Sequence, residues 1–329
     1  VEPLIEGDNL VSATASDSAF NETVDTLTIT YDSFTAADLT GDWSFVGSGF
    51  EPSETTSWTS HGTLRFDDDG DISSDIPFTG TYSTDPTGVD SEEISGQLTF
   101  NDDGALSGSA LYQGETLTIV DGRMDDNLSM LTLATDRELL TAVRQGSGFA
   151  QSDLTGKWYA YSVSTLAEHA GGDGLGSLVF DATGKIASGS INYTFSGPSV
   201  TFRGKPSGTG ALSADGALTG TLTLTQSKTL GISGPYSGRM STRKDLAILA
   251  FTGSDDLGDD DAMSSLLILV REGGKFATGD LNGHWRLEGV LNNRADGVVH
   301  SGYVKVLSGK VAGGELDGAP LATGSKLAL

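Results

Sequence analysis

One short pattern recurs along the chain, and this repeat restricts the possible folds more than any other feature. The copies are FTAADLTGDW at 34–43, FAQSDLTGKW at 149–158 and FATGDLNGHW at 276–285. The segments after the first two copies also match, since NDDGALSGSALY resembles SADGALTGTLTL and LLTAVRQGSGF resembles LLILVREGGKF. Repeats of this kind predict a chain built from several copies of one folded unit.

The repeat divides the chain into an arm and three units. We predict an N-terminal arm at 1–37, complete units at 38–152 and 153–279, and an incomplete unit at 280–329. The segment TLTITY at 26–31 stands before the first copy of the pattern as LLTAVRQGSGF stands before the second. The arm therefore resembles the end of a unit, and we expect it to carry one strand of the kind that closes a unit.

The units have the hydrophobic pattern of β-strands. Apolar residues alternate with Thr, Ser or Gly in short runs, as at Leu98 and Phe100 or at Leu222 and Leu224, and Gly-containing turns such as Asp69-Gly70 separate the runs. Each complete unit offers about eight such runs, and eight strands joined by short turns close into an up-and-down barrel. We predict an all-β chain with two tandem eight-stranded antiparallel barrels and an incomplete third β unit; a flattened sandwich of the same strands is the alternative.

Two motifs in each complete unit resemble the calycin superfamily, which includes the lipocalins, the fatty-acid-binding proteins and the avidins. A Gly-x-Trp opens the first strand and an Arg lies on the last, and LTGKW followed by DGALTGT is similar to an avidin opening. The resemblance implies that the tryptophan plugs one end of the barrel and the Arg lies across it. The plug residues would be Trp43 with Arg144, Trp158 with Arg271, and Trp285 in the third unit. More generally, the chain resembles secreted bacterial proteins with DLTGxW repeats, a likeness that implies no activity.

Composition excludes several classes of partner. With 45 acidic and 19 basic residues the net charge is −26, which repels nucleic acid and anionic lipid. The chain has no cysteine, so disulfides and thiolate metal sites are excluded. No apolar run approaches the roughly 20 residues that span a bilayer, so we expect no membrane insertion. The chain starts at Val1 and is rich in Gly, Ser, Thr and Asp, which favours a secreted protein, extracellular or at the cell surface.

The sequence contains no recognisable catalytic motif. Its four histidines show no HExxH spacing, and no GxSxG, P-loop or GxGxxG motif is present, so we predict no enzymatic activity and no organic cofactor. The acidic segment SDDLGDDD at 254–261 is a candidate Ca²⁺ site, and a solvated acidic turn is the other interpretation. Its carboxylates are Asp255, Asp256, Asp259, Asp260 and Asp261. Trp58 is expected in a loop at a barrel mouth, where it either contacts a ligand or neighbouring subunit or folds onto its own barrel.

The incomplete unit suggests self-association. About three or four strands cannot close a barrel, so an apolar face and two strand edges would remain exposed. The arm of one subunit can supply a strand to the half-unit of the next, and such head-to-tail contacts produce an open filament unless a ring closes. The residues expected at this subunit contact are Leu27, Ile29, Tyr31, Trp285, Tyr303 and Val306.

Other interpretations of the third unit and of the function remain open. The arm can also fold back within one molecule, and the sequence can be a truncated one. The leading hypothesis is a non-enzymatic structural protein that forms a homopolymer. The alternatives are a calycin-like binding protein for small apolar ligands and an acidic calcium-dependent surface adhesin. The bulky runs LSMLTL and LAILAF favour filled barrels over barrels with a ligand cavity.

Overall fold

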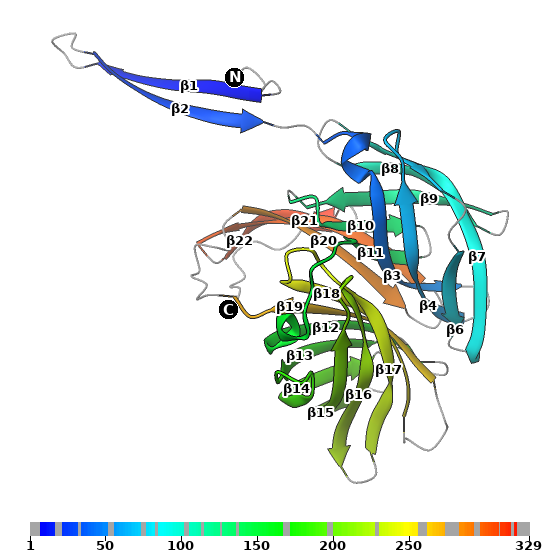
Figure 1. Ribbon diagram of the computed structural model, residues 1–329. Coiled ribbons are helices and arrows are strands. Elements are labelled where there is room, and N and C mark those ends of the chain that lie inside the picture. Colours follow the sequence, from blue (N-terminus) through cyan, green and yellow to red (C-terminus); the bar gives the residue numbers. More distant parts are fainter. Residues whose placement is uncertain are drawn as a thin grey trace.

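The computed structural model is an all-β chain that consists of two barrels and two smaller sheets (Figure 1). Two short 3-10 helices, η1 (Ala36–Leu39) and η2 (Gln151–Leu154), each precede the first strand of a barrel. The structure describes residues 7–16, 22–31, 34–51, 56–73, 77–82, 85–101, 105–112, 115–125, 127–135, 138–166, 172–195, 200–227, 230–255, 262–273, 283–292, 297–308, 310–316 and 319–320.

The first barrel is a closed antiparallel ring. Its strands are β3 (Gly41–Glu51), β4 (Thr56–Phe66), β5 (Asp71–Ile72), β6 (Pro77–Tyr82), β7 (Asp85–Phe100), β8 (Leu106–Tyr112), β9 (Glu115–Met124), β10 (Met130–Thr135) and β11 (Glu138–Arg144). The short strands β5 and β6 both lie between β4 and β7, so together they occupy one of the eight positions in the ring. The ring closes because β3 pairs with both β4 and β11.

The second barrel repeats this topology without interruption. Its strands are β12 (Gly156–Leu166), β13 (Gly172–Phe180), β14 (Ile186–Phe195), β15 (Val200–Leu212), β16 (Ala217–Ser227), β17 (Leu230–Met240), β18 (Leu246–Asp255) and β19 (Ala262–Arg271). Each strand pairs with its sequence neighbours, and β12 pairs with β19 to close the ring. The predicted fold class, two tandem eight-stranded antiparallel barrels, is confirmed, because hydrogen-bonded closure distinguishes a barrel from a sandwich.

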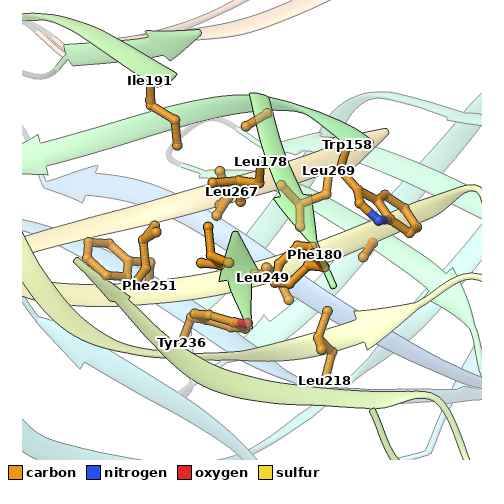
Figure 2. Packing of buried hydrophobic residues seen from close by; sticks show 14 of the residues in the cluster. Trp158, Leu178, Phe180, Ile191, Leu218, Tyr236, Leu249, Phe251, Leu267 and Leu269 are labelled. Carbon is orange, nitrogen blue, oxygen red and sulfur yellow. The ribbon is translucent and has the colours of Figure 1, made fainter. Parts of the chain in front are cut away.

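Side chains fill the described interior of each barrel. In the second barrel one continuous cluster of buried residues includes Trp158, Phe180, Tyr236, Phe251 and Leu269, and Figure 2 shows these side chains converging from different strands. A similar cluster lies inside the first barrel. Alternating apolar residues thus pack inward, as expected for a small barrel whose interior has room for little besides side chains.

Asp residues shape the turns between strands. In the DDDGD segment the Asp67 carboxylate accepts hydrogen bonds from the backbone N–H groups of Asp69 at 3.0 Å and Asp71 at 2.9 Å. Gly70 adopts a φ of 81°, in the left-handed region that favours glycine. Its carbonyl accepts the N–H of Leu98 at 3.0 Å, which ties the turn to the next strand pair. The segment is therefore a structural turn.

The outer walls of the two barrels pack against each other. A buried cluster joins Val46 of β3 and Val143 of β11 to Ile248, Ala250 and Leu266 of β18 and β19. The register places His61 opposite Val46, on the same outer wall, and burial lowers the pKa of this histidine. The two barrels therefore form one packed body through an apolar interface.

A matched pair of valines tests this interface. Val46 is 1% exposed and Val120, in β9 of the same barrel, is 58% exposed. Val46→Ala is expected to cost about 1–2 kcal/mol of unfolding free energy because it leaves a cavity between the barrels, whereas Val120→Ala should change it by less than about 0.5 kcal/mol. Thermal unfolding followed by circular dichroism measures the difference. Equal effects would contradict the interface.

Two smaller sheets accompany the barrels. Strands β1 (Gly7–Ser16) and β2 (Glu22–Tyr31) form a separate antiparallel hairpin that Figure 1 shows extending away from the barrels. Strands β20 (Gly283–Asn292), β21 (Gly297–Leu307), β22 (Lys310–Leu316) and β23 (Ala319–Pro320) form a four-stranded sheet, in which β20 lies near β3 and β11. The sequence predicted one strand in the arm, and the structure has two, because the polar segment of β1 pairs along its whole length with β2.

Candidate functional site

The repeated DLTGxW pattern builds one end of each barrel. The Asp153 carboxylate accepts the N–H of Ala150 at 2.9 Å and so holds η2, and Asp38 does the same for Thr35 at 2.8 Å in η1. The Leu154 side chain is buried, and its carbonyl accepts the indole N–H of Trp158 at 2.7 Å. In the first barrel Trp43 donates to the Leu39 carbonyl at 2.6 Å.

An arginine covers each of these tryptophans. The guanidinium carbon of Arg144 lies 4.8 Å from the centre of the Trp43 ring, and that of Arg271 lies 5.5 Å from the centre of the Trp158 ring. Arg271 also donates to the Thr155 carbonyl at 2.9 Å, so the η2 turn and the last strand are joined. Both tryptophans are fully buried. The structure thus brings these four predicted plug residues together in pairs.

The first barrel holds a buried carboxyl group towards the other end of its interior. The Glu138 carboxylate accepts hydrogen bonds from the Ser60 hydroxyl and the Trp58 side chain. Gly47 and Gly49 provide the space, because a Cβ at Gly47 would meet Glu138 and one at Gly49 would meet the Trp58 ring. Burial raises the pKa of Glu138 to about 7, although its hydrogen bonds act in the opposite direction. Trp58 therefore folds into its own barrel.

The corresponding positions of the second barrel carry neutral groups. Ser265 occupies the place of Glu138, since each residue lies six positions before the arginine of its last strand. The hydroxyls of Ser162, Ser164 and Ser265 form a chain of hydrogen bonds of 2.9 and 2.7 Å, and the Tyr193 hydroxyl donates to Ser162 at 3.2 Å. The two units thus share a topology but differ in their interior chemistry, and among the residues described only the first has a carboxyl group in this layer.

The predicted subunit-contact residues lie in two separate sheets. Leu27, Ile29 and Tyr31 belong to β2, whereas Trp285 belongs to β20 and Tyr303 to β21. The structure does not bring the two groups together, and the side chains of these five residues lie outside the described part. Val306 of β21 is 1% exposed in the single chain, so the chain itself already covers it.

The predicted calcium loop lies outside the described residues, apart from Ser254 and the backbone of Asp255 at the end of β18. Among the residues that are described, no group of three or more His, Asp or Glu side chains is arranged to hold a metal ion. The described part of the chain also has no helix long and apolar enough to cross a membrane.

Comparisons with known proteins give no assignment. No family model matches the sequence, and the search of curated proteins returned no match. A protein of unknown function from the DUF3598 family of Nostoc punctiforme is 15% identical with a TM-score of 0.26, over 72% of this chain and 98% of its own. Isotype 1 transferrin binding protein B from serogroup B Neisseria meningitidis is 9% identical with a TM-score of 0.28, over 82% of this chain and 84% of its own. Similarities this distant carry no conclusion about function.

Proposed function

We propose that this chain is a non-enzymatic structural subunit of an extracellular or cell-surface assembly, in which copies join head to tail by β-strand addition. One observation carries the proposal: the two small sheets correspond to the two ends of the same repeated fold. Hairpin β1–β2 stands directly before η1, in the same place that β10–β11 takes before η2. Strands β20 and β21 begin at the third copy of the repeated pattern, in the same place that β12 and β13 take at the second copy.

Strand pairing inside the barrels supports the proposal. In both complete units the strand that ends a unit pairs with the strand that begins it, β11 with β3 and β19 with β12. In the hairpin, β2 corresponds to the strand that ends a unit. In the four-stranded sheet, β20 corresponds to the strand that begins a unit. Within the described residues neither has such a partner, because β2 pairs with β1 and β20 pairs with β21.

The energetics of β-sheets favour an external partner for both elements. A two-stranded hairpin alone is marginally stable in water, and three or more strands with a buried face are needed for independent stability. An open sheet edge also presents unpaired N–H and C=O groups that another strand can satisfy. If the hairpin of one copy pairs with the four-stranded sheet of another, the hairpin gains additional strands and the open sheet edge gains a partner. This pairing also accounts for the similarity of the two elements to the two ends of a unit.

The filled barrel interiors favour a structural role over binding of small apolar ligands. The buried clusters run through both barrels and include large residues such as Trp158, Phe180 and Phe251. The net charge of −26 also disfavours nucleic acid as a partner of the chain. An extracellular location agrees with the acidic composition rich in Gly, Ser, Thr and Asp.

Removal of the hairpin tests the proposal. The full chain is expected to form oligomers that grow with concentration, and a variant lacking residues 1–31 is expected to stay monomeric. Light scattering after size exclusion gives the mass, and negative-stain images give the shape. Val120→Ala serves as a control with an unchanged hairpin. Monomers of the full chain at every concentration, or continued assembly without the hairpin, would overturn the proposal.

A further inference from the structure

We infer that β2 of one copy pairs antiparallel with β20 of a second copy, in the register that places Ile29 opposite Trp285. This inference rests on the proposed function and adds the partner strand and its alignment. It predicts a six-stranded sheet in the order β1-β2-β20-β21-β22-β23, shared between two copies of the chain.

The register follows from the two complete units. Trp43 lies opposite Arg144, and Trp158 lies opposite Arg271. Each of these arginines stands five residues before the phenylalanine that opens the next copy of the repeated pattern. In the arm, the residue five positions before Phe34 is Ile29. Ile29 therefore occupies the place of the plug arginine, and the third-unit tryptophan is its counterpart.

The geometry of β20 shows which of its edges is available. Trp285 lies opposite Val304 in β21, and Val304 stands two residues before Val306. In the second barrel Trp158 lies opposite Leu178, which likewise stands two residues before Phe180. The ladder between β20 and β21 thus reproduces the ladder between β12 and β13. In the second barrel the other edge of β12 receives β19. The corresponding edge of β20 carries no ladder in the described residues, and this is the edge that β2 would join.

The hairpin has a face suited to this position. Its register places Val11 opposite Leu27 and Asn9 opposite Ile29, and directly opposed residues share one face of an antiparallel pair. Thr26 and Thr28, on the alternate face, are exposed. Val270 of β19, which corresponds to Thr28, also faces outward and is 46% exposed. In the shared sheet Ile29 would then contact Trp285, whereas in the complete units an arginine guanidinium contacts the corresponding tryptophan.

Engineered disulfides test the register, because the natural chain contains no cysteine. The inferred alignment places Thr28 opposite Arg286 and Thr26 opposite Glu288, so Thr28→Cys with Arg286→Cys and Thr26→Cys with Glu288→Cys are the in-register pairs. The same four substitutions exchanged, Thr28→Cys with Glu288→Cys and Thr26→Cys with Arg286→Cys, are the matched controls two residues out of register. Opposed residues lie about 4.5–5.5 Å apart, within reach of a disulfide, and diagonal ones about 7–8 Å apart.

The expected result is a ladder of covalent dimers, trimers and larger species on a non-reducing gel for both in-register variants, and little cross-linking for both controls. Light scattering of the reduced proteins reports assembly independently. If the reduced variants assemble but the controls cross-link equally well or better, the register is wrong and the proposed function stands. A disulfide within one monomer would overturn the second copy as the partner. If no reduced variant and no wild-type protein assembles, the proposed function fails as well.

Discussion

Replacing Trp158 with alanine is expected to lower the free energy of unfolding of the second barrel by about 3–5 kcal/mol. Trp158 is one of the two largest fully buried side chains. It contacts both η2, through the Leu154 carbonyl, and the last strand, through the Arg271 guanidinium. The substitution removes the plug, deprives the Leu154 carbonyl of its indole donor and leaves the Arg271 guanidinium without the ring beneath it. Three contributions are lost together, so the effect should lie near the top of the range for core substitutions.

Urea unfolding followed by far-ultraviolet circular dichroism measures this loss. The neighbouring residue provides the control, because Tyr159 is 45% exposed on the outer wall. Tyr159→Ala should change the unfolding free energy by less than about 1 kcal/mol. If the two substitutions had similar effects, the tryptophan would not be the element that stabilises this end of the barrel.

Replacing Glu138 with glutamine is expected to change how the stability of the first barrel depends on pH. Burial raises the pKa of Glu138 from 4.5 to about 7, so between these values the folded state holds a proton that the unfolded state has released. Its contribution to stability is therefore full below pH 4.5 and is lost as the pH rises through about 7. The difference between a pKa of 4.5 and one of about 7 corresponds to about 3 kcal/mol over the full range of pH.

The measurement compares wild type and Glu138→Gln at pH 5 and pH 8. Relative to the variant, the wild type should lose about 2.5 kcal/mol over this interval, because pH 5 lies slightly above the unfolded-state pKa and because other titrating groups, including His61, contribute equally to both proteins. Asp68→Asn, at an exposed carboxylate in a turn, serves as the control and should follow the wild type. Parallel curves for wild type and Glu138→Gln would show that the carboxyl group is not held in a desolvated site.

The barrels were predictable because their signal is local and repeated. Alternation marks the strands, glycine turns separate them, and the repeat fixes how many strands each unit holds. The resemblance also implied the pairing of Trp43 with Arg144, since a glycine, a tryptophan and a last-strand arginine recur in both units. These features depend on residues close in sequence or at corresponding positions of the two copies.

The buried carboxyl group was not predicted, because its environment is assembled from distant residues. Glu138 stands at the start of β11, where a charged residue usually marks an exposed strand end, and Ser60 is 78 residues away. The glycines at 47 and 49 were a usable signal, since the second unit has serines in the corresponding places. A difference between copies at matching inward positions indicates a change of interior packing.

The interface between the barrels was also missed, although the sequence carries a sign of it. LAILAF and LLILVR are continuous apolar runs, and a strand buried on both faces has this pattern. We interpreted LAILAF as filling the interior, which accounts for Ala247, Leu249 and Phe251. Ile248 and Ala250 alternate with them and face the first barrel. The second apolar face needed a partner that periodicity alone does not identify.

The different interior fillings of the two barrels also bear on misfolding. Chains of similar repeats are prone to exchange strands between neighbouring units while they fold. If β11 joined β12 in place of β3, Glu138 would meet Ser162 and Ser164, where its own barrel has the two glycines that make room for it and for Trp58. The exchange would thus crowd the Glu138 side chain against two hydroxyl-bearing side chains. Divergence of the copies at one interior layer is therefore expected to disfavour exchange of β11 into the second barrel.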